Sequence, residues 1–316
     1  MLNCKKILTS VAAGALLFSI NASEKKQTPK YHYTHPIKCI SDSGEARHAP
    51  SRSLAAFRLA MERKADAFKL DIRYTKDQIP VLTHNDNLKS AMNWNVSLGS
   101  KTLAELKERN LKPSFGYNNE KIVSLPEVLE IIKDAPEFEL DHKGYFREER
   151  FRKTLEEFGK AGISLDRVTI ASWSDKVLRF MMREYPNVRR VKHIQLCYST
   201  KKKGTVFNTF GYPETGGNPK DIVKLLLKVR DEYKLYGLNL PLRAFKQGLL
   251  NADHVKALRD AGVWVSLWNP QNAEEAKFAA EIGVDAVVTG NLKEVRPFCR
   301  IPENKDNNDK QNEVKK

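Results

Sequence analysis

The sequence has no long hydrophobic run, few cysteines and a shortage of acidic residues. Hydrophobic residues make up 41% and charged residues 29% of its 316 positions, and its mean hydropathy is −0.53. These values are typical of a soluble globular protein and exclude a membrane bundle or a wholly disordered chain. The length allows one large domain or two average ones, because α/β barrels use about 200 to 250 residues around a single core.

The shortage of acidic residues makes the protein basic. It has 54 Lys and Arg against 39 Asp and Glu, a formal net charge of +15, which suits anionic partners such as phosphates or lipid head groups. The basic residues form only short clusters, such as Lys201-Lys202-Lys203, and no zinc-finger or RNA-binding pattern is present, so we expect no nucleic-acid partner. A small anionic ligand and contact with a membrane surface stay open, and a basic solvated surface explains the charge equally well.

The N-terminus resembles a secretory signal. Lys5 and Lys6 precede a short apolar run over 7–20, and Asn21-Ala22-Ser23 offers a small-residue cleavage point. We therefore expect a signal peptide over 1–23, a polar linker over 24–35 and a periplasmic or secreted mature protein. The Asn-, Lys- and Asp-rich residues 302–316 have too little apolar surface to fold, which predicts a disordered tail.

Cysteine is scarce, and its spacing excludes familiar metal sites. Cys4 lies in the predicted signal, which leaves Cys39, Cys197 and Cys299. Three thiols allow one disulfide with a free thiol, or no disulfide at all. A buried apolar role is the interpretation that we favour for each.

Between residues 36 and 301, apolar runs alternate with stretches of helical periodicity. The runs with strand character are 37–40, 67–72, 81–83, 138–141, 168–171, 193–196, 237–240, 263–268 and 286–289. The helical stretches are 53–64, 103–109, 125–134, 147–161, 176–185, 220–233, 252–261 and 273–282. Residues 199–219 break the rhythm and are expected to form a long loop. The pattern predicts a single-domain α/β fold, a (β/α)8 TIM barrel, whose active site lies at the carboxyl ends of the strands.

Polar residues at these strand ends are the candidate site. They are Asp42, Ser43, Lys69, Asp71, His84, Asp141, Lys143, Ser172, Ser174 and Trp268. Carboxylates, lysines and a histidine that converge on one barrel mouth favour phosphate or metal chemistry. The two later serines have no evident base, so each is better explained as a helix cap.

Segments along most of the chain, from about residue 40 to 292, resemble the glycerophosphodiester phosphodiesterase family. The matching segments include Ser53-Leu54-Ala55-Ala56-Phe57, Leu70-Asp71-Ile72, Pro80-Val81-Leu82-Thr83-His84, Val265-Ser266-Leu267-Trp268 and Gly283-Val284-Asp285-Ala286-Val287-Val288-Thr289. The resemblance implies a (β/α)8 barrel related to phosphatidylinositol-specific phospholipase C. It also implies that one histidine deprotonates a glycerol hydroxyl, a second protonates the leaving alcohol, and two glutamates and an aspartate hold a divalent cation.

Several positions depart from the family pattern. The His-Arg-Gly motif aligns with Asp42-Ser43-Gly44, Pro-Glu-Asn reads Pro50-Ser51-Arg52, Glu-x-Asp reads Lys69-Leu70-Asp71, and Glu-x-Lys reads Asp141-His142-Lys143. The second catalytic histidine matches His84. Exchanging a ligand glutamate for Lys69 alters the site charge by two units, and an ammonium repels a neighbouring divalent cation by several kcal/mol at an effective dielectric of about 20.

These positions lead to an assignment of roles. We assign His84 as general acid and Asp42 as base, and we expect Lys69 to take the place of the cation. The candidate substrate-binding residues are Lys69, Lys143, Ser43, Arg52 and Trp268. Asp71 and Asp141 are metal ligands only if Ca²⁺ or Mg²⁺ is retained, against the charge of Lys69. The sequence predicts an exported phosphodiesterase of lipid metabolism with an altered site, and leaves open an inactive barrel, a pseudoenzyme, that binds an anionic or polyol ligand.

Overall fold

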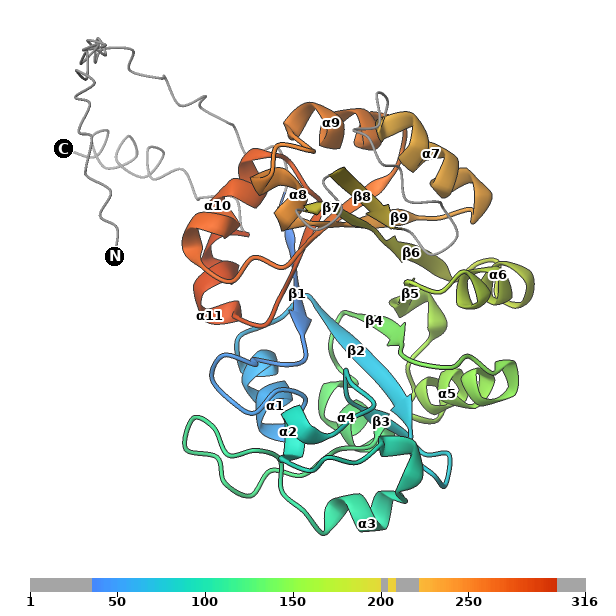
Figure 1. Cartoon of the computed structure of the whole chain (residues 1–316), viewed down its shortest axis with the longest axis vertical. Helices are drawn as coiled ribbons and strands as arrows, with labels where there is room; N and C mark the ends of the chain where they lie inside the picture. Colours follow the sequence, from blue (N-terminus) through green and yellow to red (C-terminus); the bar gives the residue numbers. More distant parts are fainter. Residues whose placement is uncertain (1–35, 200–203, 209–221, 300–316) are drawn as a thin grey trace, which may run out of the picture. The chain divides into compact units, whose positions relative to one another are not determined.

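A computed structural model shows a closed barrel of parallel strands. It describes residues 36–199, 204–208 and 222–299, so the predicted signal, linker and tail lie outside the described residues. The barrel strands, in the order in which they pair, are β1 (Lys38–Asp42), β11 (Ala286–Thr289), β10 (Trp264–Trp268), β9 (Gly237–Pro241), β6 (Arg189–His193), β5 (Val168–Ser172), β4 (Glu137–His142) and β2 (Ala67–Tyr74). Pairing of β1 with β2 closes the ring and confirms the predicted (β/α)8 barrel (Figure 1).

Helices lie between successive strands and cover the outside of the barrel. They are α1 (Leu54–Glu62), α2 (Lys89–Met92), α3 (Leu103–Lys107), α4 (Leu125–Ile132), α5 (Glu148–Lys160), α6 (Asp175–Glu184), α7 (Ile222–Glu232), α8 (Leu242–Lys246), α9 (Ala252–Asp260), α10 (Ala273–Glu281) and α11 (Leu292–Val295). Three 3₁₀ turns accompany them: η1 (Leu98–Ser100), η2 (Leu165–Arg167) and η3 (Arg296–Phe298). The eight predicted helices are all present, and the short α2, α8 and α11 were not predicted because one turn gives little periodicity.

Three further strands lie outside the barrel, and they correct the sequence prediction. β3 (Pro80–Leu82) pairs antiparallel with β2, so the apolar run over 81–83 is not a barrel strand. The run over 193–196 straddles the end of β6 and the start of β7 (Gln195–Ser199), which pairs with β8 (Gly204–Asn208). The prediction of a loop over 199–219 is therefore wrong at 204–208, where β8 forms. Most of the other residues of this range lie outside the described ranges.

The location of β6 was misjudged because its sequence, Arg-Arg-Val-Lys-His, is charged. Arg190 and Lys192 nevertheless have 6% and 0% exposure. The Arg190 guanidinium donates to backbone carbonyls, including Val188 O at 2.8 Å, and the Lys192 ammonium contacts Asp175. Because these partners satisfy the charges, both side chains pack between strand and helices, and hydrophobicity does not mark the strand.

Helix starts near the barrel mouth are fixed by side-chain caps. Ser53 Oγ accepts from the Ala56 amide at 3.1 Å at the start of α1. Thr102 and Glu105 cap each other at the start of α3, where the Thr102 amide donates to Glu105 Oε2 at 2.8 Å. Such caps satisfy amides that have no partner within the helix.

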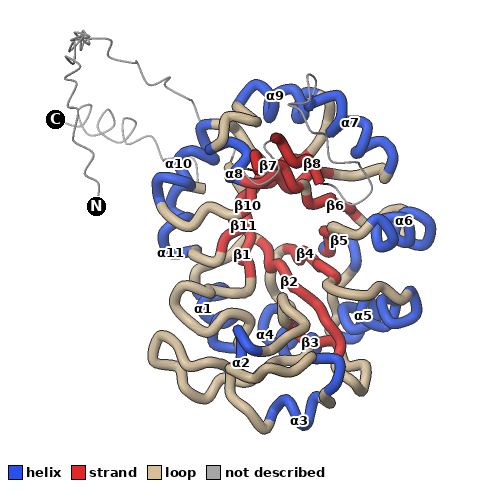
Figure 2. Tube along the Cα trace, viewed as in Figure 1, coloured by secondary structure: helices blue, strands red, loops and turns tan. Residues whose placement is uncertain are grey.

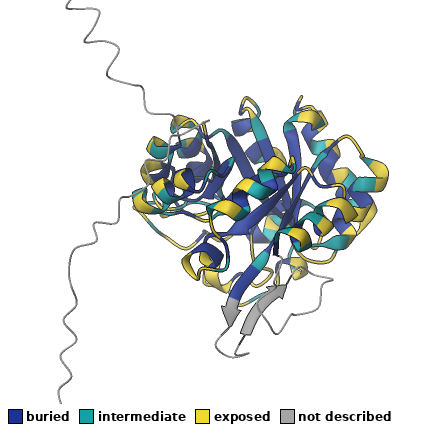
Figure 3. Cartoon of the chain, turned by 90° about the horizontal axis from the view of Figure 1, so that it is seen from above, coloured by how far each residue is buried: buried dark blue, intermediate teal, exposed yellow. Residues whose placement is uncertain are grey.

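Side chains along a strand point alternately to its two faces, and in this barrel one face is apolar and the other, toward the barrel axis, is polar. On β2, Phe68, Leu70 and Ile72 belong to the main core, while Lys69 and Asp71 alternate with them and face the barrel axis. Figure 3 shows the strands buried in the centre and the exposed residues on the outer faces of the helices. The polar groups are thus held at the carboxyl ends of the strands by apolar packing on the other face.

The segment between β3 and α4 is mostly loop (Figure 2). It carries α2, η1 and α3 and packs around a small core of its own. That core consists of Val81, Leu88, Met92, Leu98, Leu106, Leu111 and Ile122. The segment is tied to the barrel where Arg73 Nε donates to the His84 carbonyl at 2.8 Å.

Cys39, Cys197 and Cys299 are buried and unbridged. The buried role that we favoured for them is confirmed. In the part of the chain that the structure describes, no helix combines the length and the apolar character needed to cross a bilayer.

Candidate functional site

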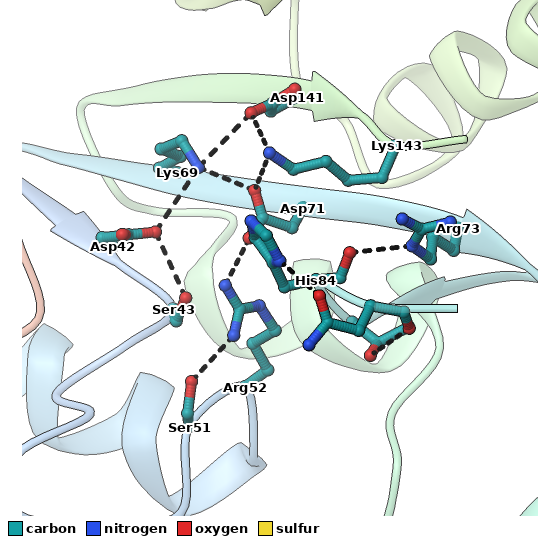
Figure 4. Close-up of polar contacts among 12 residues, drawn as sticks. Asp42, Ser43, Ser51, Arg52, Lys69, Asp71, Arg73, His84, Asp141 and Lys143 are labelled. Carbon is teal, nitrogen blue, oxygen red and sulfur yellow. Dashed lines mark hydrogen bonds and ion pairs between the residues drawn. The ribbon is translucent and has the colours of Figure 1, made fainter. Parts of the chain in front are cut away.

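The centre of the site is an ammonium surrounded by carboxylates. Lys69 Nζ lies 2.7 Å from Asp71 Oδ1, 3.5 Å from Asp42 Oδ1 and 3.5 Å from Asp141 Oδ2. The three aspartates come from β2, β1 and β4, whose carboxyl ends meet at the barrel mouth (Figure 4). Parallel pairing explains the convergence, because it sets Asp42 opposite Lys69 and Asp71 opposite Asp141.

Two more cationic side chains complete the cluster. Lys143 Nζ lies 2.6 Å from Asp141 Oδ2 and 3.5 Å from Asp71 Oδ1. The Arg52 guanidinium contacts the other oxygen of Asp71. Three carboxylates therefore face three cations, and the group is close to neutral before any ligand binds.

Burial makes these charge pairs strong. Asp71 and Asp141 are each 1% exposed and Lys69 is 7% exposed. Burial alone would raise the pKa of the Asp71 carboxyl, but Lys69, Arg52 and Lys143 hold it well below its usual range. Burial would likewise lower the pKa of Lys69, but the surrounding aspartates raise it well above its usual range. Both groups are therefore ionised at neutral pH.

A further carboxyl, Glu139, lies one layer deeper in the barrel. It is opposite Lys69 in the register of β2 and β4 and is 2% exposed. Burial raises its pKa to about 8, and its Oε1 has no hydrogen-bond partner. Glu139 is thus mostly protonated at neutral pH. Sequence reasoning missed it, although its position two residues before Asp141 on one strand is the signal for a second inward-facing group.

His193 was also missed as a site residue, because its run was assigned to the wrong strand. It ends β6, and its Nε2 lies 3.0 Å from Asp141 Oδ2, while Nδ1 lies 3.0 Å from the Asn239 amide nitrogen. Since that amide donates, Nδ1 accepts and Nε2 carries the proton that Asp141 accepts. Burial lowers the pKa of His193 by more than the neighbouring Asp141 carboxylate raises it. The His193 ring is therefore neutral, and its N–H group holds the Asp141 carboxylate in place.

Two tryptophan rings lie beside His193. Trp173 lies 5.2 Å from the His193 ring and 5.9 Å from the Trp268 ring, the latter edge-on. Trp268 Nε1 is buried without a hydrogen-bond partner. Trp268 is not among the residues that line the pocket at His84, and its role as a wall for the substrate stays a prediction.

His84 lies at the mouth, outside the charge cluster. Its side chain is exposed, and Nδ1 is 2.8 Å from Asn85 Oδ1. No protein group among the described residues contacts Nε2, which leaves that nitrogen free for a substrate. His84 and Arg52 line the same pocket, of about 360 Å³.

The loop after β1 carries Asp42, Ser43 and Arg52 into the site. Ser43 Oγ donates to Asp42 Oδ1 at 3.2 Å. Ser43 and Arg52 have φ angles of 70° and 63°, in the left-handed region. Glu45 anchors this loop, since it is fully buried, lies 2.9 Å from the Arg63 guanidinium and accepts from the Leu292 amide at 2.9 Å.

A divalent cation does not fit this arrangement. The described residues contain no group of three or more His, Cys, Asp or Glu side chains placed to hold a metal ion. The Lys69 and Lys143 ammonium groups occupy Asp71 Oδ1 and Asp141 Oδ2, and leave Asp141 Oδ1 without a hydrogen-bond partner. A divalent cation needs several free oxygen ligands and would be repelled by these ammoniums.

Sequence comparison relates residues 43–294 to the Glycerophosphoryl diester phosphodiesterase family, whose sequence model matches this range. A glycerophosphodiester phosphodiesterase of Caldanaerobacter subterraneus is 34% identical over 97 residues, 30% of this chain and 40% of that protein. The chain thus spans less than half of that relative's length. Bovine glycerophosphodiester phosphodiesterase 1 is 24% identical over 276 residues, 83% of this chain and 80% of that protein.

Solved structures share the fold. An Oleispira antarctica phosphodiesterase in complex with the product sn-glycerol-3-phosphate has a TM-score of 0.68 at 19% identity, over 84% of this chain and 98% of that chain. A glycerophosphodiester phosphodiesterase from Thermotoga maritima has a TM-score of 0.61 at 20% identity, over 82% of this chain and 96% of that chain. At these identities the likeness concerns the barrel itself.

Proposed function

Because the chain belongs to the glycerophosphoryl diester phosphodiesterase family, we propose that it hydrolyses lipid-derived glycerophosphodiesters through an altered site without a bound cation. The observation that supports this most directly is the Lys69 ammonium, 2.7 Å from Asp71 and 3.5 Å from Asp42 and Asp141. It places a fixed positive charge among the carboxylates that would otherwise hold a metal. A fixed charge aimed at a phosphoryl oxygen stabilises the negative charge that develops there.

The proposed substrate-binding groups are Arg52, Lys69, Lys143 and Ser43, with Trp268 as a wall. The phosphate would lie at the open side of the cluster and share the cations with the three aspartates. Arg52 presents a planar fork of donors, so it contacts Asp71 and still has N–H groups for a phosphate oxygen.

The proposed chemistry is paired acid–base catalysis. A glycerol hydroxyl oxygen of the substrate attacks phosphorus and gives its proton to the Asp42 carboxylate. The bond from phosphorus to the leaving alcohol breaks, and His84 Nε2 donates a proton to that oxygen. Water then opens the cyclic phosphate with the two roles reversed, which restores both groups.

One observation favours the alternative of an inactive barrel that binds an anionic or polyol ligand. The described contacts include no hydrogen bond between His84 and any group of the charge cluster, and each cation of the cluster already faces a carboxylate. A neutral cluster binds a ligand phosphate without polarising it strongly.

Hydrolysis of a glycerophosphodiester panel by the mature protein separates the two functions. We expect turnover that is equal with Ca²⁺, with Mg²⁺ and with chelator, and that falls by about 10²-fold or more in His84→Ala. His254→Gln, a half-buried histidine in α9 replaced by a residue that can still cap the helix, is the matched control. Turnover that requires a cation would contradict the proposed role of Lys69, and no turnover with any substrate would favour the binding protein.

We also propose that the protein is exported and acts outside the cytoplasm, on diesters released at a membrane surface. Support comes from the signal-like residues 1–23 and the net charge of +15, which suits contact with anionic lipid. Cell fractionation of the full-length chain, beside a chain that starts at residue 24, tests this. Equal distribution of the two chains would contradict export.

A further inference from the structure

A pocket beside the charge cluster has a charge of its own. It is about 360 Å³ in volume and lies between the loop after β1, the end of β3 and the segment that leads to α4. About half of its wall is apolar, including Leu82, Leu111, Pro113 and Ile122. The pocket is large enough for a small alcohol.

The pocket adjoins the chemistry at two residues. Arg52 lines it and also contacts Asp71 of the cluster. His84 lines it with the ring whose Nε2 has no protein partner among the described residues. A phosphodiester with its phosphate at Arg52 therefore directs one of its two alcohol groups into this pocket, next to the proposed general acid.

The charged groups of the pocket wall are cationic. Arg52 and Lys112 line it, and none of its described lining residues is acidic. The Lys112 side chain is exposed and forms no ion pair among the described residues. The backbone at Lys112 is held in place because its amide donates to the Ala91 carbonyl at 2.7 Å. An ammonium carried by a residue of the pocket wall, with no ion pair among the described residues, repels a second cation and attracts the oxygens of a neutral alcohol.

The turn that covers the pocket holds an exposed aromatic ring. Ser114 and Tyr117 pair across it, and Phe115 and Gly116 have φ angles of 52° and 82°. Phe115 is 58% exposed and lines the pocket. A left-handed conformation is unfavourable for phenylalanine, and such strain is concentrated where a side chain has a function. Here the ring provides an apolar cover for a bound alcohol.

From these observations we infer that the pocket binds the leaving alcohol and selects an uncharged alcohol such as glycerol over a cationic amino alcohol such as choline. Lys112 and Arg52 determine the choice by charge, and Phe115 provides contact area that does not depend on charge. This inference rests on the proposed function, which it extends to the class of substrate.

The test compares glycerophosphoglycerol and glycerophosphocholine, which differ in the charge of the alcohol at similar size. We expect the wild-type protein to show a kcat/KM at least about tenfold higher for glycerophosphoglycerol. Lys112→Glu should reduce this ratio by about tenfold, chiefly through KM for glycerophosphocholine. Lys160→Glu makes the same charge change at the end of α5, on the opposite end of the barrel, and should leave the ratio unchanged.

Phe115→Ala should raise KM for both substrates by several fold and leave the ratio unchanged. A wild-type ratio near one, or a ratio that Lys112→Glu does not change, overturns the inference. If the wild-type protein hydrolyses neither diester, the proposed function fails. Calorimetric titration with the same two compounds then tests the selectivity of the pocket independently of catalysis. At least tenfold tighter binding of glycerophosphoglycerol, lost in Lys112→Glu, supports the pocket, and equal affinities overturn it.

Discussion

At the scale of single residues, Lys69 decides what the mouth of the barrel can hold. Among the lysines that the structure describes, Lys69 and Lys192 are the buried ones, and Lys69 faces three carboxylates at once. Removing one partner of a buried ion pair leaves an uncompensated charge, which costs about 3 to 5 kcal/mol. Lys69 is therefore essential to the stability of this cluster as well as to its proposed chemistry.

Lys69→Glu should convert the cluster into a cation site. The variant would bring a third carboxylate next to Asp71 and Asp141, so we expect it to be less stable than the wild-type protein without metal. Millimolar Ca²⁺ should then raise its melting temperature by several degrees, because a ligand that binds only the folded state stabilises it. Differential scanning calorimetry with Ca²⁺ and with chelator measures this shift.

Lys69→Gln is the control for that experiment, because it removes the ammonium without adding a carboxylate. Its melting temperature, like that of the wild-type protein, should not respond to Ca²⁺. An equal response of all three proteins would show that the cation binds elsewhere.

At the scale of elements, β4 presents two different faces to its neighbours. Asp141 faces the barrel axis and Lys69, while His142 faces outward and packs edge-on against Phe146 and Phe151, the latter in α5. Both ring nitrogens of His142 are buried without a hydrogen-bond partner. Burial, with help from Arg150, lowers the pKa of His142 to about 4. A titratable ring therefore occupies the place of an aromatic core residue.

Protonation of His142 should weaken the packing of β4 against α5 in mild acid. In the unfolded chain the imidazole has a pKa of about 6.5, so as the pH falls below that value the unfolded state binds the proton first. Stability is then lost progressively from about pH 6.5 down to about pH 4. His142→Phe should remove this part of the acid sensitivity, worth about 1 to 3 kcal/mol at pH 4.

Urea unfolding of both proteins at pH 7.0 and pH 4.5 measures the effect. His254→Gln, in α9 and outside the contact between β4 and α5, serves as the control, because it removes a histidine without changing this packing and can still cap the helix. Identical pH dependence of the wild-type protein and His142→Phe would contradict the assignment of a neutral buried ring.

At the scale of the whole molecule, barrel closure and net charge act together. β1 pairs with both β2 and β11, and the Ile37 amide donates to the Cys299 carbonyl at 2.9 Å, so the two ends of the described barrel meet at its base. Closure brings residues from β1, β2 and β4 to one mouth. The chain as a whole carries a net charge of +15, which attracts an anionic substrate over distances of about 10 Å at about 0.1 M salt and farther at lower salt.

The association of an anionic diester should therefore depend on ionic strength. Raising NaCl from about 20 to about 300 mM should lower kcat/KM by roughly three- to tenfold, because screening shortens the reach of the field. The value of kcat should stay constant, since the buried cluster is screened much less. Steady-state kinetics at several salt concentrations tests this, with sucrose of equal osmolality as control, and an unchanged kcat/KM would contradict electrostatic steering.

Apolar periodicity and position at a strand end are local properties of the chain, and they predict the barrel, its helices and most polar residues of its mouth. Asp42, Lys69, Asp71, Asp141 and Lys143 were identified in this way, and the structure brings them into one cluster. Their roles in catalysis and binding remain predictions. The replacement of a ligand glutamate by Lys69 was also visible from the chain alone.

Which groups face one another follows from the folded barrel and cannot be read from the order of residues. Strand β6 is charged in sequence, and only the fold shows that backbone carbonyls and Asp175 satisfy its charges and that His193, at its end, contacts Asp141. Glu139 and the pocket between Arg52, His84 and Lys112 depend on register and on the packing of segments far apart in sequence. The balance of three cations against three carboxylates follows from closure of the barrel, because pairwise distances between strands, and not the order of residues, determine which charges are paired.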